Sequence, residues 1–322
     1  MDQNMVSPYY RQYHIGLQWE FYKGYAIEPE FISTSGAKLI GYYDINTFDG
    51  RTASGLSTTR INTTIGADNY RNNNFKSNYK AMQLTMKKNY SAGLGFNASY
   101  TWSRALDSLS DLFNARGSTS GPVDTMNPMM DWGPADFHMK HRFVGTFSYE
   151  LPFMKQNKYL GGWNINTIIT LQSGVPFSPW TSSSSGDKNK DGRSSDRLVY
   201  VGKGDAMNSK FENSSPADAY YDTSKWAVYS CPSTVNGGLW CNSPQGRGTM
   251  TGPGFHNVDF SFQKQFKVRE GVKLALMGNF FNLFNHTNFD LPGSNRNVGP
   301  SYGKSIAAFS PRITQLAARI DF

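Results

Sequence analysis

The clearest pattern of chemically useful residues lies in the segment GDKNKDGRSSD, at positions 186–196. Three oxygen-bearing side chains alternate along it: Asp187, Asn189 and Asp191. Oxygen ligands at the first, third and fifth positions, followed by a glycine such as Gly192, form the first half of a calcium-binding loop. Leu198 replaces the bidentate glutamate of the twelfth position, and Asp196 could supply a carboxylate instead. The segment therefore predicts a calcium (Ca²⁺) site, and the alternative is a solvated turn.

The only two cysteines, Cys231 and Cys241, lie in CPSTVNGGLWC with nine residues between them. In an oxidising compartment such a close pair predicts a disulfide that staples a loop. Two free thiols in a cytosolic protein are the alternative. Zinc is a weaker candidate, because no second pair of cysteines or histidines accompanies them at ligand spacing.

The sequence contains no catalytic constellation. His138 and His141 are three residues apart at the beginning of an expected strand, so their side chains would point to opposite faces. Neither a GxSxG nor an HExxH motif occurs. The segment GPSYGKS, at positions 299–305, is one residue short of a phosphate-binding loop. We therefore expect that the protein is not an enzyme.

A group of aromatic residues lies outside the expected strands and could stack on sugar rings or other flat ligands. Its members are Trp132, Trp180, Tyr220, Tyr221, Trp226 and Trp240. The alternative is that these side chains pack the loops against one another.

Composition favours strands over helices as the elements that hold these residues. Aromatic residues make up 15% of the 322 residues, which excludes a disordered chain. The net charge of +8 is dispersed along the chain, so we expect no nucleic-acid partner. No run of eighteen apolar residues occurs, which excludes a transmembrane helix. The beginning, MDQNMVSPYY, does not resemble a signal peptide, so the chain is either cytosolic or continues upstream.

Segment after segment alternates apolar and polar residues with a period of two, as strands with one apolar face do. In GLGFNASYTWS, for example, Phe96, Tyr100 and Trp102 alternate with Asn97 and Thr101. This pattern predicts nine strands, near residues 9–21, 25–35, 77–88, 94–104, 141–151, 162–173, 256–267, 272–285 and 312–322.

The connections between these strands alternate in length. Short ones are expected at 22–24, 89–93, 152–161 and 268–271, and long ones near 36–76, 105–140, 174–255 and 286–311. Short turns at one end and long loops at the other are typical of a transmembrane antiparallel β-barrel with extracellular loops. A soluble β-sandwich, the alternative, gives no reason for this alternation. Aromatic residues near the strand ends would form the two girdles of such a barrel.

An odd number of strands is itself informative. Bacterial single-chain barrels have an even number, and open strand edges in lipid cost several kcal/mol per unsatisfied group. We therefore expect this chain to be the C-terminal portion of a larger barrel. A hairpin hidden in 174–255, with LVYV at 198–201 as one strand, is the alternative.

Five segments carry a resemblance to a known family: NYKAMQLTMKKNYSAGLGFNASYTWSRALD, HRFVGTFSYELPF, GGWNINTIITLQSGVPF, GPGFHNVDFSFQKQF and NFFNLFNHTNF. Together they resemble the C-terminal barrel of TonB-dependent outer-membrane transporters of the Oar-like group, whose members often carry a carboxypeptidase-regulatory-like domain. The resemblance implies part of a 22-stranded barrel in the outer membrane of a Gram-negative-type bacterium. It also implies uptake of a large or scarce nutrient. The signal peptide, TonB box, plug and earlier strands of that family are not found in this sequence.

The resemblance also implies partners. These would be outer-membrane lipid and lipopolysaccharide, the remaining strands and the plug, TonB through the plug, and the barrel assembly machinery. A passive porin or adhesin-like barrel, and a secreted soluble β-sandwich, remain alternative functions.

The chain ends in RITQLAARIDF, which the preceding pattern makes the ninth strand. Leu316, Ala318, Ile320 and Phe322 would then face lipid. A C-terminal aromatic residue after alternating apolar residues resembles the signal that the outer-membrane assembly machinery recognises. We therefore expect Phe322 to be an assembly signal.

Overall fold

The computed structural model describes residues 1–47, 59–111, 122–124, 127–152, 157, 161–182, 187–193, 195–207, 219–235 and 240–322. Regular structure in this part of the chain is almost entirely β-strand. Its helices are short 3-10 turns: η2 (Pro128–Asp131), η5 (Thr223–Lys225) and η7 (Arg296–Ser301). No helix of the described residues has the length and apolar character needed to cross a membrane.

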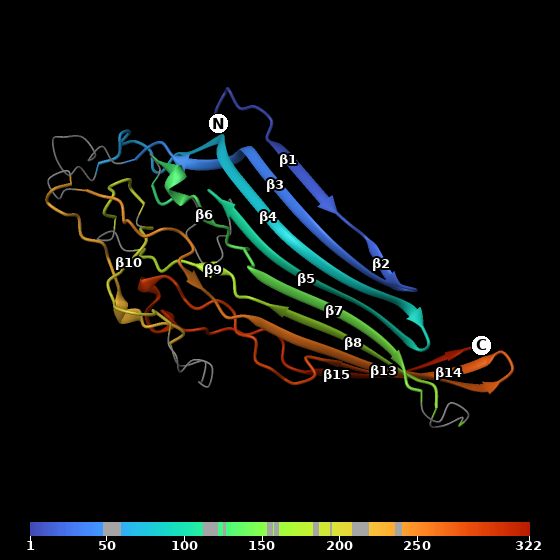
Figure 1. Cartoon of the computed structure of the whole chain (residues 1–322). Coiled ribbons are helices and arrows are strands. Elements are labelled where there is room, and N and C mark those ends of the chain that lie inside the picture. Colours follow the sequence, from blue (N-terminus) through green and yellow to red (C-terminus); the bar gives the residue numbers. More distant parts are fainter. Residues whose placement is uncertain are drawn as a thin grey trace.

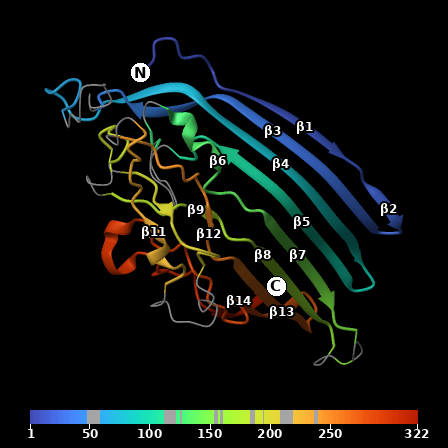
Figure 2. The ribbon, with the colours of Figure 1, turned by 60° about the vertical axis from the view of Figure 1, so that its left-hand side comes forward.

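One large antiparallel sheet dominates the molecule, and it is curved along its whole width (Figures 1 and 2). Its path has nine strands in the order β1 (Tyr9–Gly16), β3 (Tyr25–Asp44), β4 (Asn69–Ser91), β5 (Leu94–Asp107), β7 (His141–Glu150), β8 (Trp163–Gln172), β13 (Phe255–Arg269), β14 (Val272–Phe281) and β15 (Ile313–Asp321). Two short strands lie beside this path: β2 (Trp19–Tyr22) pairs with β3, and β6 (Gly133–Pro134) pairs with β5. Among the described residues, β1 and β15 are each paired on one side only, so the sheet is open.

The strand register brings apolar side chains together on one face of this sheet. Phe260 pairs with Phe280, and Phe96 pairs with Phe147. Since alternate residues of a strand share a face, the same face carries an apolar residue at most positions of every long strand. Ring pairs such as Phe96–Phe147, with centroids 5.9 Å apart, show that neighbouring strands contact one another across it.

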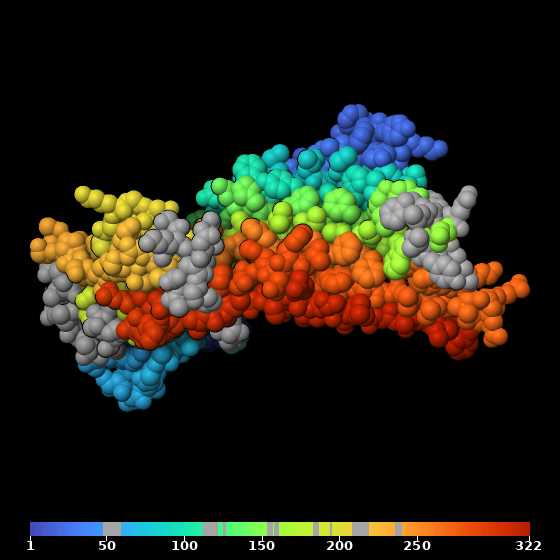
Figure 3. All heavy atoms as spheres, turned by 90° about the horizontal axis from the view of Figure 1, so that it is seen from below, coloured from blue at the N-terminus to red at the C-terminus, as the bar shows by residue number. Residues whose placement is uncertain are grey.

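The connections differ at the two ends of the sheet. Tight turns such as Ala92–Gly93, between β4 and β5, lie at one end. Both residues have positive φ, which matches the twist of a two-residue hairpin turn. The long connections gather at the other end, at the left of Figures 1 and 3.

The strand predictions were wrong in two places. The segment 36–76 was expected to be a long connection, but β3 continues to Asp44 and β4 begins at Asn69. Register shifts around Leu39 conceal the period-two pattern there, because each bulge reverses the faces of the following residues. The first expected strand, 9–21, is interrupted, since β1 ends at Gly16 and β2 begins at Trp19.

The segment LVYV does not add a hairpin to the main sheet. Its strand β10 (Val199–Tyr200) pairs with β11 (Trp226–Ala227) in a separate two-stranded sheet among the loops. A second small sheet joins β9 (Pro176–Phe177) to β12 (Met250–Thr251).

Candidate functional site

The face of the sheet opposite the apolar one is a polar wall. Neighbouring strands are joined across it by side-chain hydrogen bonds, such as Thr85 Oγ1 to Ser99 Oγ at 3.1 Å and Ser148 Oγ to the Asn166 side-chain oxygen at 2.8 Å. An ion pair, Lys87 Nζ to Glu28 Oε2 at 2.5 Å, lies on the same face. A wall of this kind suits contact with water or with a polar partner.

The long connections form a loop assembly with a hydrophobic core of its own. Its buried members are Phe177, Leu198, Ala206, Tyr220, Tyr221, Trp226 and Met250. The two small sheets help to build it, because β9, β11 and β12 each contribute one or more of these residues. The Tyr221 ring lies 5.6 Å from that of Phe177 and 6.5 Å from that of Trp226, centroid to centroid.

Burial corrects part of the prediction for the loop aromatics. Tyr220, Tyr221 and Trp226 belong to the core of the loop assembly and do not face a ligand, so the packing alternative holds for them. Burial also raises the pKa of the Tyr221 hydroxyl, which donates a hydrogen bond to the Gly293 carbonyl at 3.2 Å. Only tertiary contacts distinguish these rings from exposed ones, since their local sequences are equally polar.

The other three rings are more accessible. Trp132 is 39% exposed at the end of η2 and keeps a free ring surface. Trp180 is partly buried, and its indole N–H donates to Ser294 Oγ at 3.2 Å. Trp240 is also partly buried. A ligand-stacking role for these three rings stays a prediction.

One buried ion pair ties the loop assembly to the main sheet, and another ties it to η2; neither was predicted from the sequence. Arg247 forms an ion pair with Asp107, the last residue of β5, and its Nε lies 3.7 Å from the Asp136 carboxylate. Arg197 forms an ion pair with Asp131 of η2. All these side chains are nine-tenths or more buried. Such pairs join residues that are far apart in the chain, so no local sequence pattern predicts them.

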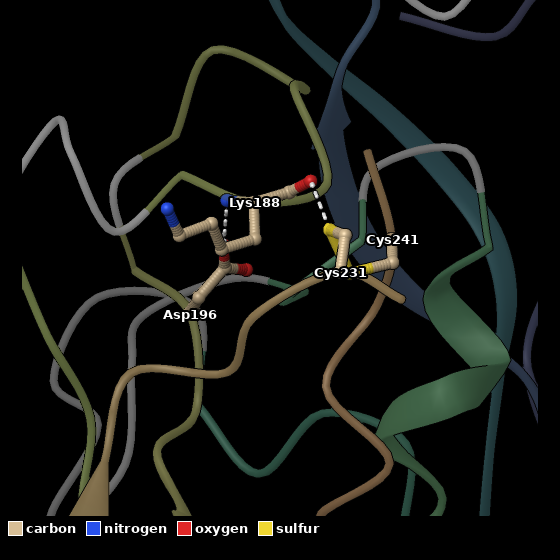
Figure 4. Close-up of a disulfide and its surroundings, with 4 residues drawn as sticks. All are labelled: Lys188, Asp196, Cys231 and Cys241. Carbon is tan, nitrogen blue, oxygen red and sulfur yellow. Dashed lines mark hydrogen bonds between the residues drawn. A yellow bond between two sulfur atoms is a disulfide. The ribbon is translucent and has the colours of Figure 1, made fainter. Parts of the chain in front are cut away.

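The disulfide is present: Cys231 Sγ and Cys241 Sγ are bonded, with Cα atoms 5.5 Å apart (Figure 4). It lies against the aspartate-rich segment, because the Cys241 N–H donates to the Lys188 carbonyl at 2.8 Å. The Lys188 N–H in turn donates to Asp196 Oδ2 at 2.6 Å. The disulfide thus holds one side of the predicted calcium loop.

The aspartate-rich segment folds as a tight loop. Gly192 and Lys190 have positive φ, and the Gly192 N–H donates to Asp187 Oδ2 at 3.2 Å. Asp187, Asn189, Asp191 and Asp196 are all buried. Burial raises the pKa of Asp196 to about 7, and the charges of Asp191 and Asp187 contribute to this shift.

The donor set of this loop only partly fits a metal. The buried Oδ1 atom of Asp196 accepts no hydrogen bond, which leaves a carboxylate oxygen for a cation. In the described part of the chain, however, no three side chains of His, Cys, Asp or Glu converge as metal ligands would. Calcium would therefore need amide and carbonyl oxygens as well, and its binding stays a prediction.

Phe322 lies beyond the last residue of β15 and is fully exposed. The structure thus leaves its ring accessible to another protein, and its role as an assembly signal stays a prediction.

Comparison with known proteins decides the family. A family model described as outer membrane beta barrel domain matches residues 1–315. The chain belongs to this family of outer-membrane β-barrels. Its apolar face is therefore the lipid-facing side of a barrel wall, and its polar wall faces the barrel interior. The outer-membrane location expected from the sequence is confirmed, and membership in a family of membrane barrels agrees with the expectation that the protein is not an enzyme.

One solved structure supports the same fold for this barrel domain, and a second is reported as similar only. The outer membrane transporter YddB from Escherichia coli is 10% identical, with a TM-score of 0.52, and the match covers 99% of this chain and 33% of that chain. The ferric preacinetobactin receptor BauA from Acinetobacter baumannii is also 10% identical, with a TM-score of 0.46, over 97% of this chain and 29% of that one. The chain thus spans about a third of the length of these structures. No curated protein matches the sequence.

Proposed function

We propose that the protein takes up a large or scarce nutrient across the outer membrane with energy delivered through TonB. This chain would supply part of the barrel wall and of the ligand-facing loops. The observation that carries the proposal is the loop assembly, which has its own core and buried ion pairs at one end of a polar wall. A preorganised mouth of this kind suits capture of a ligand before transport, since rigid loops lose little entropy on binding.

The resemblance of the five sequence segments to TonB-dependent transporters supports the energised form of this proposal. A passive porin has the same kind of wall, but it needs no plug and no contact with TonB. An adhesin-like barrel would use its loops without transport. These alternatives differ from the proposal in measurable ways.

The test uses the full-length protein from its own outer membrane, purified in detergent. Two probes are applied: the purified periplasmic domain of TonB in a binding assay, and potassium chloride in planar-bilayer conductance measurements. We expect saturable TonB binding and no steady open conductance. A steady conductance without TonB binding would assign the protein to the porins, and the absence of both would favour the adhesin.

A further inference from the structure

A hollow of about 530 Å³ lies on the lipid-facing side of β3, β4 and β5. Its apolar wall is formed by Phe31, Met82 and Trp102. The register pairs Met82 with Phe31 on one neighbouring strand and with Trp102 on the other, so the three side chains lie in a row. They are 41–56% exposed, which is what a surface in contact with acyl chains requires.

Three cations line the same hollow: Lys80, Arg104 and Lys140. Lys80 pairs with Arg104, and both lie two residues farther toward the long loops than Met82 and Trp102. Lys140 reaches the same place from the segment before β7, where its carbonyl accepts a hydrogen bond from the Ser103 N–H at 3.0 Å. The hollow therefore has an apolar part and, on its loop side, a basic part.

The positive charge at this place is uncompensated. All three side chains are exposed, and none of them forms an ion pair with a carboxylate of the described residues. His138, which also lines the hollow, has a lowered pKa because of its burial and then because of the charges of Arg104 and Lys140. Its Nδ1 accepts a hydrogen bond from the Ala105 N–H at 3.2 Å, as a neutral imidazole can.

Two lysines at the opposite end of the same face show the contrast. Lys88 and Lys264 are 8% and 3% exposed, and their ammonium groups donate to carbonyls in or directly beside the short turns. Lys88 Nζ, for example, lies 2.7 Å from the Leu94 carbonyl oxygen. The chain thus satisfies its lipid-facing lysines internally at the turn end and leaves three cations open at the loop end.

Lys80, Arg104 and Lys140 lie at the depth expected for the lipid headgroups of the outer leaflet. Arg104 lies ten residues along β5 from Leu94 at the turn end. At about 3.3 Å per residue and a strand tilt of about 40°, this distance rises by about 25 Å, which is the height of the apolar band of an outer-membrane barrel. Lys80, Arg104 and Lys140 therefore lie where phosphate groups of the outer leaflet begin, and Arg and Lys both bind phosphate.

We propose that this hollow binds lipopolysaccharide through its phosphorylated, acylated lipid A portion. The phosphates contact Lys80, Arg104 and Lys140, and an acyl chain lies along Phe31, Met82 and Trp102. The presence of lipopolysaccharide around the protein was expected from the sequence, whereas the structure assigns it a place on the barrel wall. This inference depends on the outer-membrane location and not on the substrate or on TonB.

The test compares two variants of the full-length protein that lose the same charge. The site variant carries Lys80→Gln, Arg104→Gln and Lys140→Gln, and the control variant carries Lys23→Gln, Lys267→Gln and Lys273→Gln, which change exposed lysines at the turn end. Binding of bisphosphorylated lipid A to the detergent-purified proteins is measured by native mass spectrometry. Dephosphorylated lipid A, phosphatidylglycerol and inorganic phosphate serve as comparison probes. Heat-shifted migration on a gel verifies that each variant is folded.

We expect the site variant to bind lipid A at least tenfold more weakly than the wild type and the control variant to bind it normally. Dephosphorylated lipid A should also bind at least tenfold more weakly to the wild type. Equal binding by both variants would overturn the proposal. Tighter binding of phosphatidylglycerol, or full displacement of lipid A by millimolar inorganic phosphate, would overturn it too, because the site would then recognise another lipid or a free anion. Should the triple variant fail to fold, the single variant Lys140→Gln replaces it in the same comparison, because Lys140 lies outside the strands. We then expect lipid A to bind about threefold more weakly.

Discussion

At the scale of single residues, buried charges hold the loop assembly in place. Arg247 is about 5% exposed between two carboxylates that come from the end of β5 and from the segment after η2. A buried ion pair contributes little compared with a well-packed apolar pair, but removal of one partner leaves a charge buried without compensation. These positions are therefore sensitive to single substitutions although they lie in loops.

We predict that Arg247→Met destabilises the loop assembly by about 3–5 kcal/mol, because Asp107 and Asp136 then lose their shared cation. Limited proteolysis of the folded protein in detergent measures the effect as faster cleavage within the loops. Lys225→Met is the matched control, since Lys225 lies 3.7 Å from Asp222 in a partly exposed pair that contributes at most about 1 kcal/mol. Equal cleavage rates in the two variants would show that the buried pairs do not hold the loops.

The calcium prediction also belongs to this scale. In calcium-free buffer we expect Asp196→Asn to leave the melting temperature unchanged or raised, because the amide relieves repulsion with Asp187 and Asp191. Calcium at a hundredfold excess over its dissociation constant should stabilise the wild type by about 2.7 kcal/mol and should not stabilise the variant. Asp191→Ala should lose the calcium response as well, whereas Asp205→Asn, at an exposed position outside the loop, should keep it. A wild-type melting profile that calcium does not change would end this prediction.

At the scale of the elements, β15 shows how one strand serves both membrane contact and assembly. Leu316 and Ile320 are 78% and 62% exposed on the lipid-facing face of β15. One edge of the strand pairs with β14 through nine consecutive residue pairs. The strand therefore has a complete hydrogen-bonded ladder along the edge next to β14, and its apolar face is largely exposed. Phe322 continues that face by one alternation step.

We predict that deletion of Phe322 lowers the amount of protein in the outer membrane severalfold and leaves the ligand affinity of the assembled fraction unchanged. Phe322 is fully exposed just beyond the turn end of β15, far from the long loops, so a folding defect after assembly is not expected. Quantitative immunoblots of outer-membrane fractions measure the effect, with Phe322→Tyr as the control that keeps an aromatic ring. Normal membrane levels after the deletion would refute an assembly role.

At the scale of the whole molecule, the large sheet separates a continuous apolar face from a polar one. This arrangement is stable only between lipid and an aqueous or protein-filled interior, because the apolar face would otherwise remain in water. The loop assembly at one end and the short turns at the other give the wall an orientation, with the loops outside the cell.

We predict that the protein requires detergent for solubility and migrates faster on a gel before heating than after it. A barrel wall that further strands close resists detergent until heating breaks its backbone ladder, which would account for the shift. Circular dichroism before and after heating checks that strand content is lost together with the change in migration. A water-soluble monomer without detergent would contradict the membrane-barrel assignment.

The sequence by itself determined the strands whose faces alternate without interruption. The expected strands near 94–104, 141–151 and 162–173 agree with β5, β7 and β8 within a few residues, because each has one face in lipid and the other in a polar interior. The disulfide was also determined by local sequence, because two thiols so close in the chain form a bond with little loop-closure entropy.

Only the tertiary structure decided what depends on residues far apart in the chain. The bulges around Leu39 are set by pairing with β4, so the length of β3 could not be derived from its own pattern. The burial of Tyr221 and Trp226, the pairs of Arg247 and Arg197, and the hollow between Lys80 and Lys140 each join several separate segments. Alternation is a local property of the backbone, whereas burial and charge compensation depend on which segments meet after folding.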